Sequence, residues 1–144
     1  MIDAIGRTLH KISNVQKNTA KDYRASKVMF VIITDGEENS SREYNADAVK
    51  AMIEEHKERH SWEFVFLGAN IDAVSTAGKF GIRTNRAVDY LADGEGTSLN
   101  FNVMSAAVSE YRQCESSAPS LSDEHFEVIR EDVKKRKGKI HLSK

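Results

Sequence analysis

A run of six apolar residues, Val28 to Ile33, constrains the fold of this chain more than any other segment. The turn sequence Thr34-Asp35-Gly36 closes the run. An unbroken apolar run of this length, bounded by a turn, is typical of a strand that is buried on both faces. Because such strands lie inside parallel sheets that are covered by helices, we expect an α/β fold.

Helical and strand patterns alternate along the rest of the chain. Apolar residues at steps of three and four predict helices at 2–15, around 49–53, at 97–113 and around 126–133. A shorter helix is predicted from Asp72 to Phe80, stopped by Gly81. The alternation predicts a three-layer, Rossmann-like unit with helices on both faces and right-handed crossovers. Its parallel sheet is expected to comprise residues of about 27–34, 62–68 and 87–91.

The 144 residues fit one domain followed by a tail. We expect an α/β domain over residues 1–114. Residues 115–144 are predicted to form a linker with the only proline, Pro119, then a C-terminal helix and a basic tail. The basic residues of the tail, 134–137, follow Glu131 and Asp132, which favours a solvated helix end over a docking site for an acidic partner.

Composition and charge restrict the partners. Hydrophobic residues make up 40% of the chain and charged residues 30%, which is the balance of a globular protein. The net charge of −1 argues against a nucleic-acid-binding face, which needs an excess of Lys and Arg. No apolar run approaches the roughly 18 residues that span a bilayer, and the N-terminus lacks a signal-peptide pattern. The single cysteine, Cys114, excludes an intramolecular disulfide. We therefore expect no nucleic-acid or membrane partner and a cytoplasmic location.

The most specific local signal is the strand end at Asp35. Ligands of parallel α/β sheets gather outside the carboxyl ends of the strands, and a carboxylate there is a hard oxygen ligand suited to Mg²⁺. One carboxylate does not make a site, because octahedral Mg²⁺ takes several oxygens. An Asp that only caps or turns the chain accounts for the pattern equally well.

Several segments together resemble the middle of a von Willebrand factor type A (VWA) domain. Asp3-Ala4-Ile5-Gly6 heads a helix, and after a gap a hydrophobic strand ends in Ile33-Thr34-Asp35-Gly36-Glu37. Phe66-Leu67-Gly68-Ala69-Asn70 is similar to the family's next strand and connection. The resemblance spans roughly residues 2 to 113, and Thr34-Asp35-Gly36 is its most specific part.

The resemblance implies only part of the family's metal-ion-dependent adhesion site. That site holds a divalent cation with an Asp-x-Ser-x-Ser motif after the first strand, a Thr in a later loop and an Asp after the fourth strand. Only the last of these has a match, Asp35, and no Asp-x-Ser-x-Ser occurs in the chain. The resemblance thus implies the C-terminal portion of the domain, with the other half missing through truncation, an internal start or a separate gene. Any Mg²⁺ binding is expected to be weak.

Three further motifs have plainer interpretations. His56 and His60, at i and i+4, could grip a metal, but no Glu lies at the offset of a His-Glu-x-x-His motif. We expect all the histidines to be solvated, namely His10, His56, His60, His125 and His141. Gly94-Glu95-Gly96-Thr97 could cradle a phosphate but lacks a P-loop Lys, so we expect a flexible loop capped by Thr97. Cys114 has no activating His at motif spacing and is expected to be inert.

The resemblance implies a non-enzymatic, protein-binding module of the adhesion or scaffold type. Asp35 would be its metal ligand, and Glu37 and Asn70 would lie on the ligand-facing rim. The alternative is a Mg²⁺-dependent phosphotransfer or hydrolytic enzyme that uses Asp35 with Asn70, Asp72 or Asp93. A structural remnant without metal function is a third interpretation.

The strand at 28–33 also predicts how the chain assembles. In the family's strand order the missing first strand lies beside it, and no proline or lysine within the run guards the bare edge. We favour a two-fold homodimer in which this strand pairs antiparallel with its own copy. The alternatives are a missing half supplied in trans, or the N-terminal or C-terminal helix folded over the edge.

Overall fold

The computed structural model describes residues 1–37, 40–116 and 121–142, and it contains the predicted alternation of helices and strands. The elements in chain order are α1 (Ile2–Asn18), a 3-10 turn (Lys21–Tyr23), β1 (Met29–Thr34), α2 (Ala46–His60), β2 (Glu63–Gly68), α3 (Ala73–Lys79), a second 3-10 turn (Thr84–Arg86), β3 (Ala87–Asp89), α4 (Gly94–Gln113) and α5 (Glu124–Leu142). Within the described ranges, no helix has both the length and the apolar character that crossing a membrane requires.

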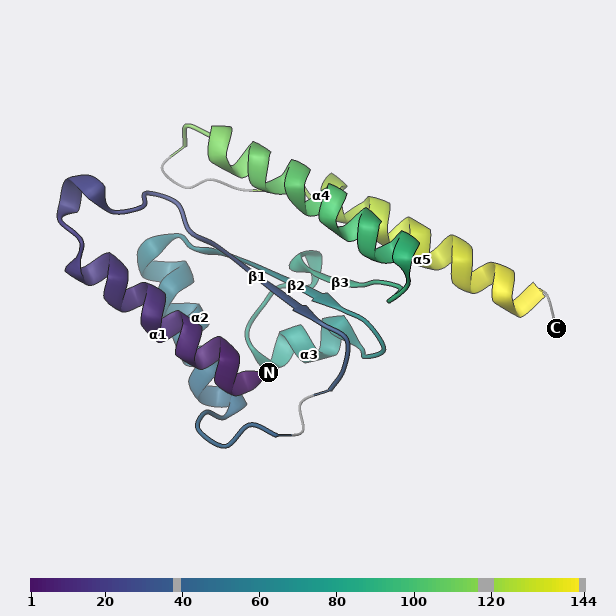
Figure 1. The fold of residues 1–144 in the computed structure, drawn as a ribbon, viewed down its shortest axis with the longest axis horizontal. Coiled ribbons are helices and arrows are strands. Elements are labelled where there is room, and N and C mark those ends of the chain that lie inside the picture. The colour runs from purple at the N-terminus through teal and green to yellow at the C-terminus, as the bar shows by residue number, and fades with distance from the viewer. Residues whose placement is uncertain (38–39, 117–120, 143–144) are drawn as a thin grey trace.

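The three strands form one parallel sheet in the order β1-β2-β3, and their bounds lie within two residues of those predicted. In the register, Phe30 of β1 lies opposite Phe64 of β2, and Phe66 of β2 lies opposite Ala87 of β3. Helices α1, α2 and α3 cover one face of the sheet, and α4 and α5 run along the other (Figure 1). The expectation of a small α/β fold with helices on both faces of a parallel sheet is confirmed.

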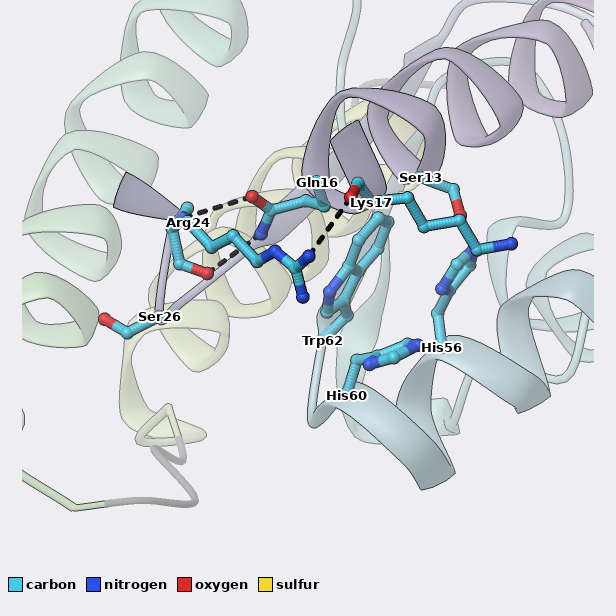
Figure 2. A pocket seen from close by; sticks show the side chains of 9 residues that line it. Ser13, Gln16, Lys17, Arg24, Ser26, His56, His60 and Trp62 are labelled. Atoms are coloured by element: carbon cyan, nitrogen blue, oxygen red, sulfur yellow. Dashed lines mark hydrogen bonds between the residues drawn. The ribbon is translucent and has the colours of Figure 1, made fainter. Parts of the chain in front are cut away.

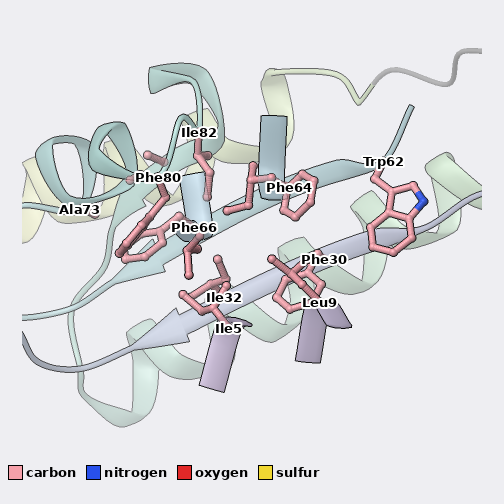
Figure 3. Packing of buried hydrophobic residues seen from close by; sticks show 14 residues of the cluster. Ile5, Leu9, Phe30, Ile32, Trp62, Phe64, Phe66, Ala73, Phe80 and Ile82 are labelled. Atoms are coloured by element: carbon pink, nitrogen blue, oxygen red, sulfur yellow. The ribbon is translucent and has the colours of Figure 1, made fainter. Parts of the chain in front are cut away.

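The first core lies between the sheet and helices α1 to α3. Successive strand residues point to opposite faces, so alternate aromatic and aliphatic side chains of β1 and β2 enter this core. Ile5 and Leu9, one helical turn apart on α1, point toward Phe30 and Ile32 (Figure 3). Phe66 is fully buried and packs against Phe80 beyond α3 with ring centroids 6.4 Å apart.

The second core lies between the sheet and helices α4 and α5. The strands contribute Val65, Leu67 and Val88 to this core. Phe126 and Ile129 of α5 are almost fully buried in it, so α5 shares a core with the sheet and with α4. Most of the predicted linker, residues 117–120 with Pro119, lies outside the described residues.

The prediction that β1 is buried on both faces is wrong for one face. Phe30 and Ile32 are buried in the first core, but Met29 and Val31 are only half-buried and Ile33 is 48% exposed. The physical reason is the position of β1 at the edge of the sheet, where α4 covers only part of its outer face.

Two further sequence expectations are corrected by the structure. Helix α4 begins before Thr97, because the carboxylate of Asp93 caps it by accepting a hydrogen bond from Gly96 N at 2.7 Å. The segment expected to be a flexible loop, Gly94 to Thr97, is therefore the first turn of α4. The amide of Gly96, which could have bound a phosphate, instead donates to the side chain of Asp93. His56 is buried rather than solvated, since its imidazole stacks on the indole of Trp62 with centroids 4.1 Å apart.

Candidate functional site

The carboxyl ends of the three strands meet at one edge of the sheet. Parallel hydrogen bonding continues beyond the strands, because Ala69 N donates to Thr34 O and Tyr90 N donates to Gly68 O, both at 2.9 Å. The segments that follow β1, β2 and β3 therefore lie side by side. Ligands of open α/β sheets bind at this end of the strands.

A cavity of about 360 Å³ opens at this edge. Glu37 and Asn70, which the sequence placed on the ligand-facing rim, both line it. The other residues that line this strand-tip cavity are Ile71, Asp72, Asp89, Tyr90, Leu91, Ala92 and Lys137. Asn70 has a φ of 57°, a left-handed conformation that Asn tolerates better than most residues, and this conformation turns the chain as it leaves β2.

Asp35 lies beside the cavity rather than among its lining residues. Its side chain is exposed, just beyond β1. Burial, and to a smaller extent the negative charge of Asp35, raise the pKa of the Tyr90 hydroxyl. The turn after β1 is closed by the Thr34 hydroxyl, which donates to Gly36 O at 3.1 Å. Asp35 is thus near enough to act electrostatically on Tyr90, which lines the cavity.

Protein groups already engage most of the described aspartates at this edge. Asp72 accepts a hydrogen bond from Ser75 N at 2.9 Å and caps α3, and Asp89 accepts one from Ala73 N at 3.0 Å. Asp93 caps α4 and pairs with Arg136 at 2.6 Å. Across residues 1–37, 40–116 and 121–142, no three Asp, Glu, His or Cys side chains converge closely enough to hold a metal ion. The described side chains at this edge therefore offer a Mg²⁺ ion few free carboxylate oxygens.

Three residues of this cavity were not predicted from the sequence, namely Asp89, Tyr90 and Lys137. Asp89 and Tyr90 could have been predicted, because they belong to the strand predicted at 87–91. The carboxyl end of that strand lies beside Asn70, which follows the neighbouring parallel strand. Lys137 could not have been predicted, because its position depends on how α5 packs across the sheet. A helical sequence pattern carries no information about that packing.

A second missed feature is the anchor of the loop that follows Asp35. The carboxylate of Asp3 accepts hydrogen bonds from three successive amides, those of Arg42 and Glu43 at 2.9 Å and that of Tyr44 at 2.8 Å. These bonds, first among them that of Arg42, hold the pKa of Asp3 below its usual value. Asp3 was expected only to complement the helix dipole. In the structure it also ties the loop to the start of α1.

We expect Mg²⁺ to bind this chain with a dissociation constant in the millimolar range or weaker. Asp35 is exposed, and the neighbouring Asp72 and Asp89 are engaged by backbone amides. Isothermal titration calorimetry measures the affinity, with Asp35→Asn as the matched variant. Micromolar binding that Asp35→Asn abolishes would contradict this expectation. Turnover of a generic phosphatase substrate, lost in the same variant, would favour an enzyme.

A scan of family models and searches of curated proteins and of solved structures give no match to this chain.

Proposed function

We propose that this chain is a VWA-like, non-enzymatic protein-binding module that meets its partner along the free edge of β1. The polar strand-tip cavity, with Glu37 and Asn70 on its rim, lies at one end of this edge, and Asp35 contributes at most weak Mg²⁺ binding. The observation that carries the proposal is that, among the described residues, no strand pairs with the outer edge of β1, and that this edge adjoins exposed apolar side chains. An open strand edge beside an apolar patch is a surface suited to strand pairing with another chain.

The apolar patch comprises Ile33 of β1 and Phe101 and Val108 of α4, which are 48%, 64% and 36% exposed. Phe101 and Val108 are seven residues apart and share one flank of α4. The opposite flank of α4 faces α5, because Ala106 and Val128 line one groove between the two helices.

The exposed flank of α4 faces the side of β1. Since α5 packs over β3, the flank of α4 that points away from α5 lies toward β1, at the other side of the sheet. Two contacts tie the end of α4 to the start of β1. The Tyr111 hydroxyl donates to Val28 O at 3.3 Å, and Lys27 Nζ donates to Arg112 O at 2.9 Å. The edge of β1 and the apolar flank of α4 therefore form one surface.

Neither terminal helix covers this edge. Helix α1 packs on the sheet face together with α2, and α5 packs over β3, so the alternative of a terminal helix folded over β1 is wrong for the described residues. The two remaining occupants are a second copy of the chain and a separate partner in trans. The sheet order, with β1 at the edge, supports the VWA resemblance, which places a further strand beside β1.

We favour the second copy as the occupant. A two-fold axis beside β1 pairs the strand antiparallel with itself and joins two three-stranded sheets into one of six strands. The same axis brings the apolar patches of the two copies together. Burying the exposed half of a large apolar side chain contributes about 1 kcal/mol, so the patch adds to the backbone hydrogen bonds of the strand pair.

Ile33→Lys is expected to weaken this dimer by tenfold or more, because it places a charge in the apolar patch that the dimer would bury. Ile33 is half-exposed in the single chain, so the fold should tolerate the substitution. Light scattering over a range of protein concentrations measures the association. Val74→Lys is the matched control, since Val74 of α3 is 39% exposed and lies away from the patch. Equal effects of the two variants, or a wild-type monomer at micromolar concentration, would count against the dimer.

A further inference from the structure

A second cavity lies at the other end of the sheet, next to the amino ends of β1 and β2. Its volume is about 200 Å³. Four segments line it: the second half of α1, the stretch before β1, the end of α2 and the residue before β2 (Figure 2). Their side chains are those of Ser13, Gln16, Lys17, Arg24, Ala25, Ser26, His56, His60 and Trp62.

The charge of this amino-end cavity is one-sided. Lys17 and Arg24 are cationic, and none of its described lining residues is an Asp or a Glu. The whole chain, by contrast, has 21 Lys and Arg residues and 22 Asp and Glu residues. A cavity lined by one sign of charge concentrates ions of the opposite sign.

Hydrogen bonds hold the cationic side of the cavity, formed by Lys17 and Arg24, in place. The side-chain amide of Gln16 forms two hydrogen bonds with the backbone of Ala25. It donates to Ala25 O at 2.8 Å and accepts from Ala25 N at 3.1 Å. The guanidinium of Arg24 donates to Lys17 O at 3.1 Å (Figure 2). It also donates to Thr19 O at 2.8 Å. The stretch before β1 is therefore fixed against α1. The cavity does not have to assemble when a ligand arrives, which lowers the entropic cost of binding.

The backbone also fixes the aromatic side of the cavity, which is formed by His56 and Trp62. Ser61 has a φ of 53° and ends α2 in a left-handed conformation, after which Trp62 N donates to His56 O at 3.2 Å. This turn lays the indole of Trp62 on the imidazole of His56, with an interplanar angle of 8°. His56 is only 6% exposed, and its Nδ1 has no hydrogen-bond partner among the described residues. A buried polar atom without a partner is rare and costs stability, so its retention requires an explanation.

We propose that the amino-end cavity binds the phosphate group of a small molecule. A phosphate offers more oxygens and more charge than a carboxylate, and the donors here approach from α1, from α2 and from the stretch before β1. The side chains of Ser13, Lys17 and His60 make no hydrogen bond that the structure describes, so they are available as donors. The cavity is smaller than the roughly 300 Å³ at which drug-sized pockets begin, which selects a compact ligand.

A bound phosphate would also change the electrostatic environment of the buried imidazole. In the free protein, burial lowers the pKa of His56, and the nearby His60, Lys17 and His10 lower it further while Glu55 opposes them. A phosphate beside the ring adds negative charge and favours the protonated form. Binding should therefore raise the pKa of His56, which the NMR titration of its ring protons measures.

The fluorescence of Trp62 reports the site directly, because Trp62 is the only tryptophan of the chain. Inorganic phosphate and glycerol phosphate are titrated into the full chain at constant ionic strength, with acetate as the carboxylate control. We expect saturable binding of both phosphates, and acetate weaker by about tenfold or more. Tighter binding of glycerol phosphate identifies a phosphomonoester as the ligand, and equal binding identifies free phosphate.

Two substitutions on α1 separate a site from general attraction to a basic surface. Lys17→Met should weaken phosphate binding by about tenfold. Lys11→Met removes the same charge from an exposed position of the same helix outside the cavity and should change binding less than about twofold. His60→Gln gives a second test within the cavity and should also weaken binding. The proposal is overturned if the two lysine variants behave alike, if acetate binds as well as phosphate, or if the fluorescence of Trp62 does not saturate.

Discussion

Replacing Arg86 by methionine is expected to lower the free energy of unfolding by about 3–5 kcal/mol, the range measured when one partner of a buried ion pair is removed. Arg86 is only 8% exposed. Its guanidinium donates to Glu63 Oε1 at 2.6 Å and to Leu121 O at 2.8 Å, and it pairs with Asp123. It also lies 5.7 Å from the ring centre of Phe126. A methionine leaves the carboxylate of Glu63 and the carbonyl of Leu121 without their donor.

Urea denaturation measures this loss of stability, and two variants serve as its controls. Arg59→Met breaks an exposed pair with Glu55 and should cost less than about 1 kcal/mol. The double variant Arg86→Met/Glu63→Leu should recover part of the loss, because it removes the stranded carboxylate together with its partner. A loss in Arg86→Met no larger than that in Arg59→Met would show that Arg86 does not hold the start of α5 to the sheet.

The second large effect is expected at Gly96, in the first turn of α4. A Cβ added there would lie 2.1 Å from the carbonyl oxygen of Leu91, which is a backbone atom that cannot swing aside. We expect Gly96→Ala to destabilise the fold by about 3 kcal/mol, at the upper end of the usual cost of overpacking. The shift would also disturb the hydrogen bond between Asp93 and Gly96 N that caps the helix.

Gly94→Ala is the matched control for this clash. Gly94 lies in the same helical turn, and a Cβ there would meet nothing within 4 Å. Since alanine is the better helix former, Gly94→Ala should be neutral or stabilising by a few tenths of a kcal/mol. Thermal unfolding of the two variants in one buffer measures the difference. Similar melting temperatures would show that the segment around Leu91 yields to the added methyl group.

The sequence predicted the elements of the fold well because their signals are local. The apolar run at 28–33 and the turn at 34–36 place β1, and the Asp72 cap and the Gly81 stop fix both ends of the short helix α3. The strand order and the lateral position of the helices depend on long-range packing. For that reason the sequence missed the exposure of Ile33, which follows from the position of β1 at the edge.

The candidate sites were predictable only in part, for the same physical reason. Glu37 and Asn70 follow predicted strands, so the sequence placed them at the strand tips, where the structure has them on one cavity. The burial of His56 was missed because a helix face rich in Glu and Lys is usually solvated. The burial of His56 depends instead on Ser61, whose left-handed conformation folds Trp62 back over α2. A single serine in an ordinary polar context carries no signal of such a turn.

If β1 pairs with the same strand of another copy, contacts between differently labelled chains will reveal the pairing. Equal amounts of ¹⁵N,²H-labelled and ¹³C-labelled protein are mixed, unfolded and refolded together, and NMR then records only contacts between chains. We expect contacts between residues 29–34 of the two copies in antiparallel order, together with contacts from Phe101 or Val108 to the partner copy. A monomer whose outward β1 amides exchange rapidly with solvent, or a dimer whose contacts between chains lie elsewhere, would contradict it.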